Sequence, residues 1–195
     1  MLKIGITGGI GSGKTTVCRV FETLGIPVFY ADVVAKDIMV SDPLLIAGVK
    51  QAFGEASYLE HQVLNKAHIA QIVFNNETEL AKLNALVHPA VFRAFDQWVE
   101  QVPANSPYIL KEAALLFESD SYKMCDKTIV VVAPFSLKKS RVMLRDQVTE
   151  AQVQARMDKQ FSDEHKIKMA DFLIHNEESA SIILQVLALH EQFIK

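Results

Sequence analysis

Eight residues near the start of the chain have the types and the spacing that bind nucleotide phosphates. Residues 8–15 read Gly-Gly-Ile-Gly-Ser-Gly-Lys-Thr and match the pattern G-x-x-x-x-G-K-[ST] at every fixed position. The glycines allow backbone conformations that turn several N–H groups toward phosphate oxygens. Lys14 supplies positive charge for the β- and γ-phosphates, and the Thr15 hydroxyl supplies a ligand for Mg²⁺. We expect a catalytic role for Lys14 and nucleotide contacts from Gly8, Gly9, Ile10, Gly11, Ser12, Gly13, Lys14, Thr15 and Thr16.

The residues on either side place this phosphate loop between a strand and a helix. Residues 3–7 are a short apolar run, and apolar residues recur at helical spacing from Lys14 until Gly25. Residues 27–31 then have the composition of a second buried strand. Strand, loop, helix and strand form a βαβ unit, which implies a parallel sheet and a right-handed crossover. The positive end of the helix dipole adds to the loop, so the sequence predicts the phosphate chain of a nucleotide and Mg²⁺ as ligands.

Asp32 stands at the end of the second predicted strand, where ligands gather in open α/β sheets. A carboxylate at that edge can take or orient the proton of an attacking hydroxyl group. The same residue precedes a helix predicted over residues 33–39, and aspartate is a common N-cap. The residues alone leave both interpretations open.

Two further groups of charged residues could act on a nucleotide. Arg141 and Arg145 share one face of a basic helix predicted over residues 136–149. They either close over ATP and neutralise the transferring charge or form a solvated basic face. Glu112 and Glu118 follow the third predicted strand and either could lie near the metal, so the magnesium ligands beyond Thr15 stay open.

The rest of the chain alternates between strand and helix patterns and predicts an α/β fold. Residues 33–103 have helical periodicity without a convincing strand, and one helical run in them is expected to end at His88-Pro89. This segment is therefore predicted to be a helical insertion between strands of the sheet. Further strands are predicted at residues 108–110, 128–133 and 172–174, and further helices at 136–149, at 150–161 with Thr149 as cap, and at 177–194.

Composition narrows the class of protein. The chain has 195 residues and a formal net charge of -3, which gives no bulk attraction to nucleic acid or to an acidic membrane. We expect no secretory signal, because the N-terminus lacks the basic and apolar regions of one, and no run approaches the roughly 20 apolar residues of a membrane helix. Cys18 and Cys125 are far apart and fit reduced thiols in a cytoplasmic protein.

Ordered motifs along nearly the whole chain resemble those of the dephospho-CoA kinase family. The phosphate loop alone occurs in hundreds of families, whereas the ordered set is highly specific. Its members are residues 4–17, Ala31-Asp32, residues 86–89 (Leu-Val-His-Pro), residues 115–118 (Leu-Leu-Phe-Glu), Arg141 with Arg145-Asp146, Arg156-Met157 and Gln160, and residues 170–174 with Asn176.

The resemblance implies a P-loop kinase with a five-stranded parallel sheet flanked by helices. It implies a nucleotide-binding core of residues 1–32 and 104–195, a lid at about 136–150, and a helical insertion, residues 33–103, that binds dephospho-CoA. The implied reaction moves the ATP γ-phosphate to the ribose 3′-hydroxyl of dephospho-CoA. Asp32 then becomes the catalytic base, Arg141 a catalytic contact to the transferring phosphate, and Arg145 and Asn176 nucleotide contacts. We expect a monomer or weak homo-oligomer.

The sequence departs from the family pattern at three places. Tyr30 stands where an aspartate is common before Ala-Asp, and Ala114 replaces the usual proline before Leu-Leu. Arg93 comes one position later after His-Pro than the pattern has its arginine, so no substrate role is assigned to it.

Two other classes fit less well. A nucleoside monophosphate kinase needs an arginine-rich second phosphate site in the insertion, and residues 33–103 hold only Arg93 and four lysines. A GTP-dependent switch needs Asn-Lys-x-Asp, and residues 65–68, Asn-Lys-Ala-His, lack the aspartate. A pure binding module would not explain Lys14, Thr15 and Asp32 together.

Substituting Asp32 by Asn and by Ala separates its two roles. If Asp32 is the base, Asn keeps a capping side chain but cannot accept a proton, so kcat falls by about 10²–10⁴-fold with ATP affinity nearly unchanged. If it is only a cap, Asn is almost silent and Ala costs about 0.5–2 kcal/mol of stability. The measurement is kcat and thermal stability of both variants, and a stable Asn variant with wild-type turnover ends the catalytic role.

Overall fold

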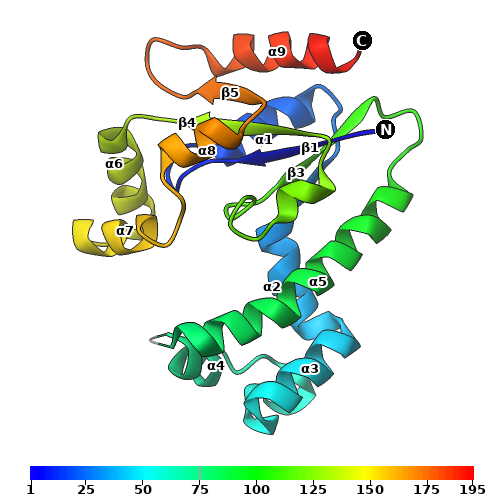
Figure 1. The fold of residues 1–195 in the computed structure, drawn as a ribbon, viewed down its shortest axis with the longest axis vertical. Helices are drawn as coiled ribbons and strands as arrows, with labels where there is room; N and C mark the ends of the chain where they lie inside the picture. The colour runs from blue at the N-terminus through cyan, green and yellow to red at the C-terminus, as the bar shows by residue number, and fades with distance from the viewer. Residues whose placement is uncertain (75) are drawn as a thin grey trace. The chain divides into compact units, whose positions relative to one another are not determined.

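The chain folds into two units in the computed structural model, which describes residues 1–74 and 76–195. One unit comprises Met1–Tyr30 with Val102–Lys195, and the other comprises Ala31–Gln101. The helix and strand labels of both units are given in Figure 1.

Five parallel strands carry the phosphate loop in the first unit. Their order across the sheet is β2-β3-β1-β4-β5, and every neighbouring pair is parallel. The five-stranded parallel sheet is therefore confirmed. Because β1 is central, the loop that follows it opens at the middle of the carboxyl edge, where ligands bind in such sheets. The strands are β1 (Leu2–Thr7), β2 (Val28–Tyr30), β3 (Tyr108–Glu112), β4 (Lys127–Val132) and β5 (Phe172–His175).

Apolar side chains of two helices cover one face of this sheet. Helix α1 (Lys14–Thr23) buries Val17, Cys18 and Phe21 against it. Helix α9 (Ile182–Phe193) packs against α1 and β5. Tyr108 connects these helices, since its ring meets Phe21 edge-on at 6.2 Å between centroids and its hydroxyl bonds His190 Nδ1 at 2.7 Å. Burial raises the pKa of Tyr108, so the ring stays neutral.

Three helices follow β4 in the order α6 (Phe135–Asp146), α7 (Glu150–Met157) and α8 (Asp163–Met169). Thr149 caps α7, as predicted, and forms a capping box with Gln152. The predicted helix over residues 150–161 is too long, because α7 ends at Met157 and Ser162 starts α8 with its own cap. The last helix likewise begins at its cap Ser181 and not at Glu177.

The second unit is built from helices in the residues that the structure describes. Asp42 starts α3 by accepting bonds from Leu44 N at 2.8 Å and Leu45 N at 3.1 Å. Its second oxygen accepts from Arg93 Nη2 of α5 at 2.8 Å, which ties the two helices together. The Arg93 bond and the two backbone bonds lower the pKa of Asp42 against the opposing effect of its burial. The helices are α2 (Ala31–Ser41), α3 (Pro43–Phe53), α4 (Lys66–Val73) and α5 (Glu77–Gln101), with short turns at Glu55–Ser57 and Glu60–Gln62.

The expected helix end at His88-Pro89 is wrong, because α5 continues through Pro89 to Gln101. A proline inside a helix loses one backbone bond and costs about 3 kcal/mol. Here α5 packs against α2, α3 and α4, and residues just after the proline, Ala90, Val91 and Phe95, are buried. Packing along the helix therefore outweighs the local penalty.

Truncating Phe21 tests the core beneath the phosphate loop. Phe21 is fully buried, so Phe21→Ala should lower the free energy of unfolding by about 3–5 kcal/mol. Leu184→Ala is the matched control, since Leu184 of the same unit is 68% exposed and should change stability by less than about 0.5 kcal/mol. Urea denaturation of both variants measures the difference, and equal losses would contradict this assignment of the core.

Candidate active site

The phosphate loop lies between β1 and α1, as its pattern requires. Gly13 is the N-cap of α1, with a left-handed φ of 92°. Lys14 Nζ donates to the carbonyl of Gly8 at 2.9 Å, so the lysine folds back over the loop that it closes. Thr15 and Thr16 are exposed in the first turn of α1, whereas the hydroxyl of Ser12 is buried and makes no hydrogen bond to the described residues. The loop thus presents backbone N–H groups and hydroxyl groups as donors beside the ammonium group of Lys14.

Two glycines of the loop are required by close neighbours as well as by their conformation. Gly11 and Gly13 have positive φ values of 81° and 92°. A Cβ atom at Gly11 would meet the carbonyl of Lys138, and one at Gly13 would meet the side-chain amide of Asn176. Helix α6 and the residue after β5 therefore lie directly against the backbone of the loop.

Asn176 and Arg141 join this loop in one hydrogen-bonded group. Asn176 Nδ2 donates to the carbonyl of Ser12 at 2.7 Å, and Asn176 Oδ1 accepts from Arg141 Nη2 at 3.1 Å. Arg141 Nη1 lies 3.4 Å from the carbonyl of Gly11. Asn176 is 8% exposed and is placed by its own N–H, which donates to Val132 at the end of β4. The guanidinium group is thus fixed at the loop, and Arg141 is not part of a solvated face.

Arg145 does not reach the loop. Its side chain, 65% exposed, bonds Asp146 twice, at 2.7 Å from Nε and 3.1 Å from Nη2. Arg156 of α7 donates to the same carboxylate at 2.6 Å. Bonds from Arg145 and then Arg156 lower the pKa of Asp146 to about 2, so this group stays ionised at neutral pH. A nucleotide contact by Arg145 requires these bonds to rearrange.

A cavity of about 610 Å³ lies beside the Asn176–Arg141 group. One wall comes from the start of α6 and the other from the residues that follow Asn176. Its lining is Pro134, Ser136, Leu137, Ser140, Glu177, Glu178 and Ser179. The lining combines apolar and hydroxyl side chains with two carboxylates, which suits a flat heterocycle with hydrogen-bond donors on its edge.

Asp32 belongs to the helical unit, so the structure does not relate its position to the loop. Helix α2 begins at Ala31, and Asp32 is an exposed residue of its first turn. The interpretation of Asp32 as N-cap is therefore wrong by position, although an acid in the first turn still interacts favourably with the helix dipole. Asn and Ala at this position both remove that charge, and the kinetic comparison of the two variants still tests the base.

Glu112 is one of the two acids, with Glu118, that the sequence left undecided. It ends β3 and pairs in register with Ile6 of β1 on one side and Tyr30 of β2 on the other, and it is 7% exposed. Burial raises the pKa of Cys18 in α1, and the nearby charge of Glu112 raises it further. The carboxylate therefore lies near the first half of α1. Buried Lys111 interrupts the apolar run that would have marked Glu112, whereas its position at the end of a strand beside β1 was a usable signal.

Three features together define a P-loop kinase. They are a parallel sheet with this strand order, a lysine-bearing phosphate loop after its central strand, and an arginine held against that loop. The model of the family described as dephospho-CoA kinase matches residues 2–181. A dephospho-CoA kinase of Salinibacter ruber is 42% identical over 178 residues, which cover 91% of this chain and 89% of the relative. One of Chlorobium chlorochromatii is 36% identical and covers 100% of this chain and 94% of the relative. The chain belongs to the dephospho-CoA kinase family.

Solved structures agree with this assignment. A dephospho-CoA kinase from Campylobacter jejuni matches with a TM-score of 0.71 and 26% identity, covering 97% of this chain and 96% of that one. A Thermus thermophilus protein matches with a TM-score of 0.86 and 29% identity, covering 100% and 98%. A shikimate kinase from Acinetobacter baumannii, 13% identical with a TM-score of 0.53 and covering 100% and 93%, shares the fold. Membership of a kinase family implies an enzyme that uses ATP. Within residues 1–74 and 76–195, each helix is too short or too polar to cross a membrane.

Replacing Asn176 tests the group at the loop. Asn176→Ala leaves the buried side of Arg141 without its acceptor, so stability should fall by about 1–3 kcal/mol and ATP binding should weaken about tenfold. Asn105→Ala, at an exposed residue of the same unit, is the control and should change neither. Chemical denaturation and ATP titration measure both quantities. Unchanged ATP affinity in the Asn176 variant would remove this residue from the nucleotide site.

Proposed function

We propose that this chain transfers the γ-phosphate of ATP to the ribose 3′-hydroxyl of dephospho-CoA, giving coenzyme A and ADP. The observation that carries the proposal is the match of residues 2–181 to a family of that activity, on a chain whose phosphate loop is complete. The high identity to relatives of the same name, over nearly their whole length, favours this substrate over a nucleoside monophosphate.

In this proposal ATP lies along the loop with its adenine in the cavity. Residues 8–16, apart from the Ile10 N–H that donates to Gln160, and the positive end of α1 bind the phosphate chain. Lys14 leaves the Gly8 carbonyl to contact the β- and γ-phosphates. The cavity beside Asn176 has walls for the adenine ring, and Arg141 stands between that cavity and the loop.

The donor set at the loop fits Mg²⁺. Thr15 offers an exposed hydroxyl directly after Lys14, and Glu112 offers a carboxylate at the end of the neighbouring strand β3. Magnesium prefers oxygen ligands and keeps several waters beside one or two protein groups and the substrate phosphates. We assign Thr15 and Glu112 to its shell. When bound, the ion neutralises charge on the phosphate chain.

The transfer itself needs a base and a cation from the protein. Asp32 takes the proton of the 3′-hydroxyl as that oxygen bonds to the γ-phosphorus and the bond to the β-phosphate oxygen breaks. Arg141 neutralises the charge that develops on the transferring group. The helical insertion, residues 33–103, binds dephospho-CoA, and the helices near residues 136–150 act as the lid with Arg145. The enzyme works in the cytoplasm as a monomer or weak homo-oligomer, without nucleic acid or membrane as partner.

The test compares acceptors side by side. Purified chain with ATP and Mg²⁺ should release ADP with dephospho-CoA much faster than with AMP or adenosine, and phosphorus NMR of the product should show a 3′-phosphate. Lys14→Ala removes the charge on the β- and γ-phosphates, so its turnover should collapse while its ligand-free melting temperature moves little. Equal or faster turnover of AMP would refute the proposal.

A further inference from the structure

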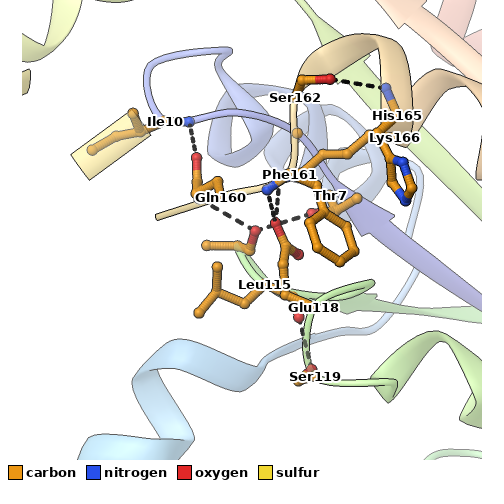
Figure 2. Close-up of polar contacts among 12 residues, drawn as sticks. Thr7, Ile10, Leu115, Glu118, Ser119, Gln160, Phe161, Ser162, His165 and Lys166 are labelled. Carbon is orange, nitrogen blue, oxygen red and sulfur yellow. Dashed lines mark hydrogen bonds and ion pairs between the residues drawn. The ribbon is translucent and has the colours of Figure 1, made fainter. Parts of the chain in front are cut away.

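The side chain of Gln160 connects the phosphate loop to the segment that follows β3. Gln160 follows α7 and lies 150 residues from the loop in sequence. Its Oε1 accepts from the N–H of Ile10 at 2.9 Å, and its Nε2 lies 3.4 Å from the carbonyl of Ala114 (Figure 2). Thr7 Oγ1, at the end of β1, donates to the same Ala114 carbonyl at 3.3 Å. One carboxamide thus uses its acceptor on the loop and its donor on the neighbouring segment.

A buried ion pair fixes the backbone directly after Gln160. The N–H of Phe161 donates to Glu118 Oε1 at 2.8 Å, and Lys166 Nζ of α8 lies 3.0 Å from the same oxygen (Figure 2). Lys166 is fully buried, and the side chain of Glu118 is 13% exposed. Glu118 therefore holds both the middle of α8 and the residue next to Gln160.

The burial of this ion pair costs much free energy relative to the stability that the pair contributes. Desolvation of two buried charges often exceeds their attraction unless further hydrogen bonds satisfy them. Glu118 Oε2 is buried without a hydrogen bond among the described residues, and the contact of Lys166 with Oε1 lacks hydrogen-bond geometry. A pair that contributes little to stability but fixes Phe161 is suited to positioning.

The same short segment also reaches helix α6. Asp163, two residues after Phe161, forms an ion pair with Lys138, whose side chain is 8% exposed. Both side chains lie against Gly9, since a Cβ atom there would be 3.0 Å from Asp163 Oδ1 and 3.2 Å from Lys138 Nζ. The segment 160–163 therefore contacts the phosphate loop at two successive residues, Gly9 and Ile10.

We propose that Gln160 is a positioning residue that sets the conformation of the phosphate loop for ATP, with the Glu118–Lys166 pair holding it in place. The inference rests on the proposed function. Both ends of the carboxamide are engaged and the next backbone N–H is bound to a buried carboxylate, so Gln160 is an anchor of the loop and not a placeholder displaced by a phosphate oxygen. Gln160 keeps the bond to Ile10 when ATP is bound.

The first experiment follows the loop itself. In Gln160→Ala the Ile10 amide should lose its partner, so its hydrogen exchange by NMR should accelerate at least tenfold in the ligand-free chain. ATP affinity by calorimetry should fall about fivefold to tenfold, the effect of one lost neutral hydrogen bond, while the KM for dephospho-CoA stays within twofold. Gln154→Ala is the matched control, because the side chain of Gln154 is exposed on α7 and donates to Asp158 at 2.7 Å, away from the loop. It should leave all three quantities unchanged.

Two further variants separate positioning from a general role in folding. Gln160→Glu keeps an acceptor for Ile10 but sets an oxygen against the Ala114 carbonyl and a negative charge beside the phosphates, so ATP affinity should fall further than in Gln160→Ala. The double variant Glu118→Gln with Lys166→Met removes both buried charges together and avoids an unpaired one. It should fold and show the ATP defect of Gln160→Ala in milder form.

The outcomes decide the proposal. Wild-type ATP affinity and wild-type Ile10 exchange in Gln160→Ala would overturn it. An ATP affinity that rises in Gln160→Ala would identify the side chain as a placeholder and would overturn it as well. Equal losses for ATP and dephospho-CoA with a lower melting temperature would mean a merely structural role. A wild-type chain that binds ATP but does not phosphorylate dephospho-CoA would refute the proposed function alone. The hydrogen-exchange and ATP-binding measurements would still test the role of Gln160.

Discussion

The proposed nucleotide site depends on the direct packing of distant segments against the backbone of the phosphate loop. Gly11 and Gly13 leave room for the Lys138 carbonyl and the Asn176 amide, which come from segments more than a hundred residues away. Asn176 then orients Arg141, and Gln160 occupies the Ile10 amide on the other side of the loop. A loop that is held at so many points reaches the nucleotide with little reorganisation, which is the condition under which backbone dipoles stabilise charge most effectively.

The charged groups near this loop differ in how deeply they are buried. Lys138 and Lys166 are buried with acidic partners, whereas Arg145 and Arg156 share Asp146 at the surface. The ion pairs of Asp146 at the surface can break at little cost, since exposed ion pairs contribute at most about 1 kcal/mol to stability. The buried pairs cannot, because removing one partner leaves an unpaired charge in a dry environment. Nucleotide-dependent movement is therefore easier for the end of α6 and for α7 than for the segment that follows them.

Sequence patterns predicted the strands and the loop because short-range chemistry determines them. The fixed positions of the loop, the Val/Ile run of β4 and the cap Thr149 each carry their own physical signal. The start of α8 was missed although Ser162, followed by Asp163 and Glu164, is a helix-start signal. The end of α7 at Met157 was missed because no glycine or proline marks it. Pro89 misled the helix assignment for the opposite reason, since local propensity was clear and packing overrode it. A four-residue spacing could not show that Arg141 and Arg145 have different partners. Only the positions of Asn176 and Asp146 in the folded chain distinguish the two arginines.

The strand order also constrains how the chain acquires its structure. Strands β1 and β2 leave the ribosome before β3, yet they are not neighbours, because β3 lies between them in the sheet. Their common partner begins at Tyr108, after the whole helical unit Ala31–Gln101. The N-terminal βαβ segment therefore exposes unpaired strand edges until that unit has been synthesised, and pairing then requires closure of a long loop. The helical unit, rich in local contacts, is suited to fold first and to bring β2 and β3 within reach, so that the sheet forms by docking around a folded spacer.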